Sequence, residues 1–250
     1  MANFIPFKKY FLYCLKKYSE KYDFQSPFLD IGCGIGDVSL FLGQNGYSGE
    51  AIDLSIDALD KAKCILFDYQ VRVHEVDFMD HKGKYNLIIF FDVMEHIEDD
   101  MKALKKIYKL LNKGGYLIIT TPSNKREWGW DDRFYGHYRR YSIEEVRNKL
   151  HKSKFGIFEI IDVSFPVFWM MRKFFVFLGL KRNSSVYKKE FQKRTVDSTA
   201  NDAWKIPVIS TLINRESIVW RVIYFIQYTF FKKFTVLGSE IMIIAKKYEN

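Results

Sequence analysis

The 250-residue sequence predicts an α/β fold with a doubly wound, mostly parallel sheet and helices on both faces. Three observations predict it. Short apolar runs alternate with longer helical patterns from residue 28 onward, which is typical of parallel strands joined by crossover helices. A glycine-rich loop joins the first strand to a helix, and a further apolar run returns at 240–247. The chain is also long enough to bury one large core.

The individual elements follow from these patterns. Strands are expected at 28–31, 49–53, 71–76, 85–91, 115–121, 155–163 and 240–247, and helices near 37–45, 55–68, 98–112 and 142–152. Ser142 and Glu145 have the spacing of a capping box at the start of the last of these helices. If 240–247 pairs with 155–163, then residues 166–237 are a helical insertion in a hairpin. We therefore expect one domain, a seven-stranded sheet, and a helical insertion before the last strand.

Residues 1–25 are expected to form an N-terminal amphipathic helix. Lysines interrupt its apolar face, so it is not an export signal, and no segment offers the roughly 20 uninterrupted apolar residues of a membrane span. Three scattered cysteines give neither a disulfide framework nor a zinc site, which predicts a reducing, cytoplasmic setting. The helical spacing is carried by Phe7, Phe11, Cys14, Leu15, Tyr18 and Tyr22.

The positive charge of the chain is concentrated in one segment. The formal net charge is +9, yet residues 1–150 are neutral. Residues 166–237 hold 13 Lys/Arg against 4 Asp/Glu, and 15 of the 44 aromatic residues. A neutral body with one basic, aromatic segment indicates contact with an anionic partner through that segment.

The loop after the first strand favours one kind of ligand over others. Glycines at this junction let the backbone approach a ligand closely. Asp37 stands where a dinucleotide fingerprint has its third glycine, and no Gly-Lys-Ser/Thr run follows, so the loop fits neither NAD nor a phosphate-binding loop. Asp53 ends the second strand, at about the ~20-residue distance from which an acid reaches ribose hydroxyls. The loop reads Asp30-x-Gly32-Cys33-Gly34-x-Gly36.

Further motifs follow the later strands. Asp77 follows the third strand, "FFDVMEHIED" the fourth, and "GHYRRYSIEEV" comes after the fifth. With the glycine loop, this sequence resembles the class I S-adenosylmethionine-dependent methyltransferases, which have a Rossmann-like fold, and particularly their small-molecule and lipid-modifying branch. The resemblance covers about residues 26–165 and returns at 238–247. It implies methyl transfer from S-adenosylmethionine.

The resemblance also implies which residues hold the cofactor. Asp30 would lie near its amino-acid end, Asp53 would accept hydrogen bonds from the ribose hydroxyls, and Asp77 would help to bracket the adenine. Two alternatives stay open: Asp30 as a structural carboxylate of the loop, and Asp53 as an acid at a helix N-terminus. The full cofactor-binding set is Asp30, Gly32, Cys33, Gly34, Gly36, Asp53, Leu54, Asp77, Phe78, Phe91 and Asp92, the last two beside the methionine portion.

Methyl transfer depends mainly on positioning, with a proton removed only where the acceptor needs it. Our catalytic candidates are His137, Tyr138 and His96, with Glu95 and Tyr141 as further groups. His137 is best placed, on the loop after the fifth strand, near the strand ends where open α/β sheets bind ligands. Structural roles for both histidines stay open.

No metal site is expected. Asp131, Asp132 and His137 could be drawn as ligands, but their spacing matches no familiar site.

The insertion bears on the substrate. Residues 166–182, "PVFWMMRKFFVFLGLKR", place aromatic side chains around Arg172 and Lys173, and 206–234 forms an apolar stripe closed by Lys232 and Lys233. This is typical of interfacial helices whose basic side chains extend toward anionic lipids. The polar residues 183–205 would connect them as a lid. Alternatively, both helices pack on the sheet edge and cover the active site.

We therefore predict a methyltransferase acting on an amphiphilic or lipid-like acceptor, cytoplasmic and peripheral on the inner membrane face. One alternative is a soluble small-molecule methyltransferase whose insertion is a lid. Another is an RNA methyltransferase, which is disfavoured because Phe91-Asp92-Val93 lacks the Pro-Pro motif of many nucleic-acid enzymes. A third is a cofactor-binding protein of the same fold without transferase activity. The acceptor atom and the oligomeric state are not predicted.

Overall fold

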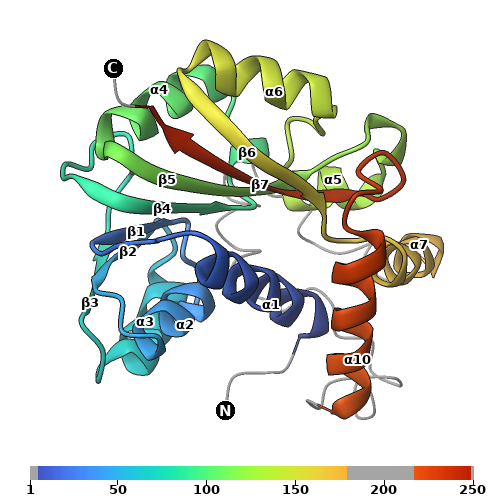
Figure 1. Cartoon of the computed structure of the whole chain (residues 1–250), viewed down its shortest axis with the longest axis horizontal. Coiled ribbons are helices and arrows are strands. Elements are labelled where there is room, and N and C mark those ends of the chain that lie inside the picture. The colour runs from blue at the N-terminus through green and yellow to red at the C-terminus, as the bar shows by residue number, and fades with distance from the viewer. Residues whose placement is uncertain (1–4, 179–216, 249–250) are drawn as a thin grey trace.

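The computed structural model describes residues 5–178 and 217–248 (Figure 1). A seven-stranded sheet runs through them in the order β3-β2-β1-β4-β5-β7-β6. All neighbouring strands are parallel except β7, which is antiparallel to both β5 and β6. This confirms the predicted fold class. The strands are β1 Phe28–Ile31, β2 Gly49–Asp53, β3 Val71–Glu75, β4 Tyr85–Phe91, β5 Leu111–Pro122, β6 Phe155–Asp162 and β7 Glu240–Lys247.

The last strand lies inside the sheet and not at its edge. Ile244 of β7 is opposite Ile118 of β5, and Ile243 is opposite Ile160 of β6. The expected pairing of 240–247 with 155–163 is confirmed, and two described helices, Val167–Leu178 and Ile218–Ile226, lie between these strands in the sequence. The sequence did not reveal that β7 also pairs with β5. A strand buried on both faces has a continuous apolar run, as β7 has at 241–245, so the pattern does not indicate which strands lie beside it.

Helices cover both faces of the sheet (Figure 1). Adjacent residues of one strand enter different cores: Ile119 packs in a cluster with α4 and α6, and Ile118 in one with α1, α7 and α10. Ser142 and Glu145 form the predicted capping box at the start of α6. The helices are α1 Pro6–Lys21, α2 Asp37–Gln44, α3 Ile56–Leu66, α4 Asp100–Leu110, α5 Trp130–Tyr135, α6 Ile143–Lys152, α7 Val167–Leu178 and α10 Ile218–Ile226, with short helical turns η1 Met94–His96, η2 Lys125–Glu127 and η4 Gln227–Phe231.

The N-terminal helix and the two described helices of the insertion pack together. The Tyr224 hydroxyl donates to the Pro6 carbonyl at 2.9 Å. Phe168 of α7 stacks on Trp220 of α10 with 6.0 Å between ring centroids, and Tyr10 of α1 lies 5.5 Å from Phe168. Segments far apart in the sequence therefore form one aromatic layer beside the sheet (Figure 1).

Part of the predicted insertion lies outside the described residues. This applies to the connector expected at 183–205, to the beginning of the apolar stripe at 206–216, and to most of the basic residues of the segment. Within 5–178 and 217–248, no helix has the length and apolar character that crossing a bilayer requires.

Candidate active site

The glycine loop turns tightly between β1 and α2. The backbone N–H groups of Gly32 and Cys33 both donate to the Ile52 carbonyl, at 2.8 and 3.0 Å, which fixes the loop against the end of β2. Gly32 has φ +71°, and a Cβ there would lie 2.4 Å from Cγ2 of Val93. Only glycine fits this turn, because a side chain would meet both the strained backbone and the segment after β4.

Asp53 closes the loop from the end of β2. Its Oδ2 accepts from the Gly34 N–H at 2.8 Å, and its Oδ1 accepts from the Ser55 N–H at 2.8 Å. A carboxylate oxygen has more than one lone pair, so both oxygens keep acceptor capacity for further donors. The neighbouring Leu54 is 53% exposed. The structure thus places an acceptor and an open apolar side chain next to the glycine turn.

Asp30 is buried behind the same turn. The carboxyl group is 2% exposed and accepts a 2.6 Å hydrogen bond from the Ser39 hydroxyl of α2. Burial, reinforced by the charge of Asp53, raises the pKa of Asp30 to about 7. This contact ties β1 to α2, so a structural role is present whatever else Asp30 does.

The predicted adenine and methionine contacts lie on neighbouring loops. Asp77 is exposed and accepts from the Met79 N–H at 2.8 Å, while the Phe78 ring is buried 5.8 Å from Phe90. Phe91 is half-buried at the end of β4 and meets Phe11 of α1 edge-on at 5.8 Å. The predicted cofactor residues thus lie at or after the carboxyl ends of β1, β2, β3 and β4.

Three carboxyl groups meet where β4, β5 and β7 end or begin. Asp92 accepts from the Thr120 hydroxyl at 2.6 Å, and Glu95 accepts from the Thr121 hydroxyl at 3.2 Å. Glu95 and Glu240 are buried, and burial raises the pKa of both carboxyl groups. The charge of the exposed Asp92 raises the pKa of both glutamates further. Sequence reasoning missed Glu240. It heads an antiparallel strand, so it starts at the edge where the parallel strands end.

His137 faces this acidic group from the loop after α5. Gly136 ends α5 in the left-handed conformation, with φ +78°, and directs the next residue back toward the sheet. His137 Nδ1 lies 2.9 Å from Oδ1 of Asp132, and Nε2 lies 4.0 Å from Oε1 of Glu95. Because a carboxylate only accepts, Nδ1 carries the hydrogen, and Nε2 is the ring atom directed at Glu95.

The second predicted histidine lies beside the first. The His96 ring centroid is 4.8 Å from that of His137, and His96 Nδ1 lies 3.1 Å from the Gly136 carbonyl, to which it donates. Burial, reinforced by the proximity of His137, lowers the pKa of His96 to about 3, so the ring is neutral at physiological pH. The structure therefore brings together two candidates that the sequence gave no reason to pair.

The two tyrosine candidates have different surroundings. Tyr138 is 38% exposed, with the Arg139 guanidinium 5.8 Å from its ring, and its backbone N–H donates to the Glu95 carbonyl at 2.8 Å. Tyr141 is 1% exposed and donates to Oδ2 of Asp100 at 2.8 Å. Tyr138 thus stays a catalytic candidate beside the acidic group. The hydroxyl of Tyr141 already donates a hydrogen bond within the core, to Asp100.

Asp132 connects the His137 loop to the insertion. Its carboxylate pairs with Arg140 at 2.7 Å and with Arg172 of α7 at 3.4 Å. Burial would raise the pKa of Asp132, but the hydrogen bond from His137 and the charge of Arg140 outweigh it and lower the pKa to about 2. Asp132 is therefore ionised and holds the His137 ring in one orientation.

Arg172 corrects one expectation about the insertion. It is 8% exposed and binds Asp131 at 2.8 Å and Glu127 at 3.1 Å, so it points into the protein and not toward a surface. Lys173 also pairs with Glu127, at 2.8 Å. The acids of η2 and α5 lie close enough to attract both cations, which local sequence patterns did not indicate.

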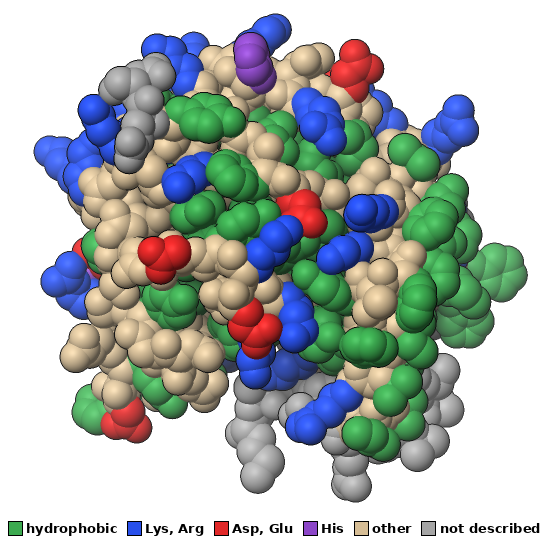
Figure 2. All heavy atoms as spheres, viewed as in Figure 1, with side chains coloured by type: hydrophobic (Ala, Val, Ile, Leu, Met, Phe, Trp, Pro, Cys, Tyr) green, Lys and Arg blue, Asp and Glu red, His purple; other side chains and the backbone are tan. Residues whose placement is uncertain are grey.

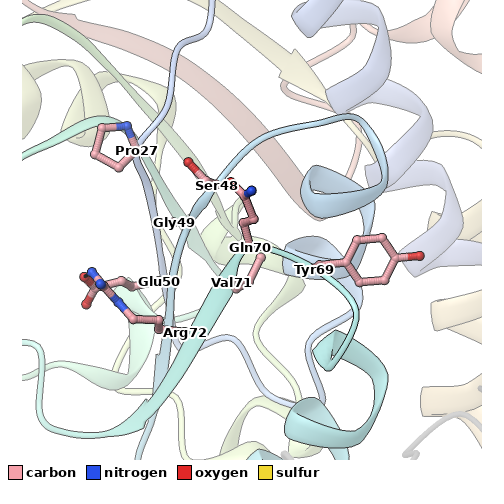
Figure 3. Close-up of a pocket in the computed structure, with 8 residues that line it drawn as sticks. All are labelled: Pro27, Ser48, Gly49, Glu50, Tyr69, Gln70, Val71 and Arg72. Atoms are coloured by element: carbon pink, nitrogen blue, oxygen red, sulfur yellow. Dashed lines mark hydrogen bonds and ion pairs between the residues drawn. The ribbon is translucent and has the colours of Figure 1, made fainter.

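A pocket of about 370 Å³ lies at the amino ends of β1, β2 and β3, away from the carboxyl ends that hold the candidate active site (Figure 3). It is lined by residues that precede or begin β1, β2 and β3, among them Pro27, Ser48 and Tyr69. Glu50 and Arg72, which form an ion pair, also line it. None of the predicted site residues lines it. It is therefore separate from the candidate active site.

Comparison with known families identifies the chain. A family model described as a methyltransferase domain matches residues 12–159, more than half of the sequence. The chain belongs to this methyltransferase family. Curated relatives of this methyltransferase include ubiquinone biosynthesis O-methyltransferases of Escherichia coli (strain K12 / DH10B) and Shigella boydii serotype 18, each 25% identical over 112 residues. The match covers 42% of this chain and 47% of each relative, so the chain spans about half the length of the curated relatives it matches.

Solved structures share the fold of this methyltransferase. The [4+2]-cyclase SpnF aligns with a TM-score of 0.62 at 16% identity, covering 96% of this chain and 81% of that protein. The N-methyltransferase NodS from Bradyrhizobium japonicum WM9, in complex with S-adenosyl-L-homocysteine, aligns at 0.58 and 14% identity, covering 98% and 89%. At such identities the likeness is one of fold, which confirms the predicted architecture. One neighbour is named as a cyclase, so the fold does not by itself identify the reaction.

Proposed function

We propose that this protein transfers a methyl group from S-adenosylmethionine to a small amphiphilic molecule at a membrane surface. The part of the site that would bind the methyl donor is called the donor half. The observation that supports it is the Asp53–Gly34 contact, which holds a glycine turn and an acceptor carboxylate together at the strand ends. Membership of the methyltransferase family and the fold shared with a structure containing S-adenosyl-L-homocysteine support the choice of cofactor. When bound, this cofactor supplies a methyl group on a positively charged sulfur.

The residues of the donor half suit such a ligand. Asp53 would use its remaining lone pairs to accept hydrogen bonds from the ribose hydroxyls, and Leu54 would give the adenosine an apolar surface. Asp77 is exposed at the outer side of the same edge, where the adenine would lie. Asp30 would act on the ammonium of the amino-acid end, and Asp92 would lie beside the methionine portion. Negative charges are the appropriate partners for a cationic ligand.

The acceptor would lie between the donor half and the His137 loop. His137 presents its Nε2 toward Glu95, and Tyr138 is exposed on the same loop. This position is at the carboxyl ends of β4 and β5, where open α/β sheets bind ligands. Asp132 fixes the orientation of His137, so a group held there would meet a preorganised site.

The choice of an amphiphilic acceptor rests on α7 and α10. Both helices expose large apolar side chains, and Figure 2 shows such side chains along the side of the molecule that they form. An extended apolar surface near basic residues is typical of peripheral contact with anionic lipids. Lys232 and Lys233 follow η4, which continues from α10. The exposed apolar face of α7, α10 and η4 consists of Met170, Phe174, Phe177, Leu178, Ile218, Val219, Val222, Phe225, Ile226 and Phe230.

Vesicle sedimentation tests the membrane part of the proposal. We expect the full chain to pellet with vesicles of anionic phospholipid and to stay in solution with zwitterionic vesicles, because Lys/Arg attract the anionic surface. The double variant Phe174→Ser/Phe177→Ser should bind at least about 10-fold more weakly, since it removes two exposed rings from the interface. Phe67→Ser is the matched control, because Phe67 is 87% exposed but belongs to the other end of the molecule, after α3.

Two outcomes would contradict the proposal. If the wild type does not bind anionic vesicles, the proposed membrane contact is wrong. If the double variant binds as well as the wild type, α7 does not take part in that contact. Calorimetry with S-adenosyl-L-homocysteine tests the donor half separately. Heat from a nicotinamide or a nucleoside triphosphate, with none from that compound, would overturn the methyltransferase proposal itself.

A soluble methyltransferase with the insertion as a lid is the second candidate. One observation favours it: Arg172 and Lys173 are paired with acids of the same protein, so neither is available in full to lipid headgroups. This candidate predicts turnover on water-soluble acceptors without vesicle binding. The sedimentation assay therefore separates the two.

A further inference from the structure

Glu95 of the acidic group and the two neighbouring histidines offer ligand atoms of the kind that bind divalent metal ions. Glu95, His96 and His137 each provide one such atom, and these atoms lie within 4.8 Å of one another. We propose that they bind one divalent cation, such as Zn²⁺ or Mn²⁺, which in turn holds the oxygen of a hydroxylated acceptor. The second half of this statement rests on the proposed function. The first half, the cation site, stands on the geometry alone.

Glu95 gives the first reason. Its side chain is fully buried, Oε2 accepts from Thr121, and Oε1 has no hydrogen-bond partner among the described residues. A buried carboxylate oxygen without a partner is costly, since it has lost water and gained nothing in return. The unpartnered oxygen faces Nε2 of His137 at 4.0 Å. An ion bonded to both atoms at about 2.1 Å allows them to lie up to about 4.2 Å apart, so this pair is within reach of one ion. The three ligand atoms lie within 4.8 Å of one another, so a small inward movement of the side chains would let all three bind it.

The histidines give the second reason. Each donates its Nδ1 hydrogen to a fixed acceptor, His137 to Asp132 at 2.9 Å and His96 to the Gly136 carbonyl at 3.1 Å. Metal-binding histidines almost always donate their other ring N–H to a carboxylate or a backbone carbonyl, which sets the tautomer and the ring orientation. Asp132 is itself held by Arg140 and Arg172. The outer contacts of a metal site are therefore in place around two rings 4.8 Å apart.

Charge gives the third reason. Asp92 and Glu95 accept hydrogen bonds from the adjacent Thr120 and Thr121 of β5, and Glu240 is opposite Pro122 of the same strand, so three carboxyl groups lie around one strand end. A divalent cation would offset the repulsion between these acids. Two imidazoles and one carboxylate suit a transition-type ion with an open coordination position, as in catalytic zinc sites.

The open position defines the class of acceptor. A hydroxyl oxygen bound to the cation becomes more acidic, and its proton leaves to solvent water. The oxygen lone pair then forms a bond to the methyl carbon, the carbon–sulfur bond breaks, and its electron pair stays on sulfur. The products are a methyl ether, the neutral thioether of the donor and one released proton. The site therefore favours O-methylation of a phenol or alcohol over methylation of an amine.

Calorimetric titration of the metal-free full chain with Zn²⁺ and Mn²⁺ tests the cation site. We expect one equivalent to bind to the wild type. Glu95→Gln and His137→Asn should each weaken binding by at least about 100-fold, because each removes a ligand, and Asp132→Asn by about 10- to 100-fold, because it removes an outer contact. His151→Asn is the matched control, since His151 is exposed on α6, and should bind as the wild type does. Binding of S-adenosyl-L-homocysteine shows that each variant is folded.

Spectroscopy of the wild type keeps the test decisive where a variant does not fold. With Co²⁺ bound, proton NMR should show two strongly shifted, exchangeable resonances, one from each Nδ1 hydrogen. A wild type that binds S-adenosyl-L-homocysteine but no cation would overturn the inference and leave the proposed function standing. Equal cation binding by Glu95→Gln and His137→Asn, or the absence of shifted imidazole resonances, would overturn it too. Cation binding without any donor binding would overturn the proposed function alone.

Discussion

The donor and acceptor halves of the site both lie at the carboxyl ends of the parallel strands, but different contacts hold each half together. Around β1 and β2, backbone groups do most of the work: Gly32 and Cys33 donate to a carbonyl, and Asp53 accepts from two N–H groups. Around β4, β5 and β7, charged side chains contact other side chains, and several are buried. Asp132 alone meets His137 and two arginines.

In the donor half, backbone geometry positions the site residues. In the acceptor half, ion pairs between side chains position them. A backbone-built turn depends on conformations that only particular residues adopt, and it senses pH little. A network of buried charges depends on every partner being present, because an uncompensated buried charge is costly. We therefore expect loss of a buried charge on the acceptor side to act mainly on stability. On the donor side, we expect strain in the turn to act on stability and loss of the Asp53 carboxylate to act on ligand affinity.

The largest expected effect is on the acceptor side. Arg172→Met removes the cation that pairs with Asp131 and Glu127, and should lower the free energy of unfolding by about 3–5 kcal/mol, because buried acids lose their partner. Lys173→Met, on the same helix, should cost less than about 1 kcal/mol, since Lys173 is half exposed and its pair is screened by water. Chemical denaturation measures both. Equal effects of the two variants would contradict the proposed contrast.

Gly32→Ala should have the next largest effect, at the junction of the two halves. The added methyl would lie 2.4 Å from Val93 Cγ2 in a backbone with φ +71°. We expect a loss of about 2–4 kcal/mol in unfolding free energy, from overpacking plus the left-handed conformation. Gly46→Ala is the control, since its φ is +83° and nothing lies within 4 Å of the added atom. It should cost about 1–2 kcal/mol. If Gly46→Ala were as destabilising, the contact with Val93 would be unimportant.

Asp53→Ala should act on affinity more than on stability. It removes the acceptor of the Gly34 N–H and of the proposed ribose contacts, so S-adenosyl-L-homocysteine should bind about 10- to 100-fold more weakly by calorimetry. Asp57→Ala, an exposed acid in the first turn of α3, should leave affinity unchanged. An unchanged affinity of Asp53→Ala would place the ligand elsewhere.

The smallest effect expected is a pH dependence on the donor side. Burial raises the pKa of Asp30 to about 7, so the carboxylate gains a proton as the pH falls through this value. The ammonium of the ligand then loses an anionic partner, and affinity should fall about 10-fold between pH 8 and pH 6, in step with the ionised fraction. Asp30→Asn should give a flat profile at the lower affinity. A slope that persists in Asp30→Asn would assign the titration to another group.

The sequence predicts the sheet and the position of the glycine turn well, because both are encoded locally. The glycine turn and Asp53 lie within about one strand–helix–strand unit, and their spacing reflects a fixed backbone geometry. The acceptor half is not encoded in this way. The sequence names His96 and His137 separately, but their approach depends on the left-handed turn at Gly136.

Longer-range contacts were still harder to predict. Arg172 lies in a basic, aromatic segment, and this composition predicts an interfacial side chain. Its side chain points inward because α5 places Asp131 beside it. Glu240 reaches the acidic group only because β7 is antiparallel and lies between β5 and β6. Periodicity indicates which residues are buried, but it does not indicate which distant side chains meet.

The position of β7 also sets an order on how the protein is made. Within the described sheet β6 pairs only with β7, so once β6 has left the ribosome it has no strand to join until the C-terminal residues emerge. Until then, one edge of β5 and both edges of β6 are open to pairing with other chains, a hazard for nascent proteins. Pairing of β7 covers the edge of β5 and one edge of β6, and it also brings Glu240 to the other two acids. The same folding step therefore protects the inside of the sheet and assembles the acidic group.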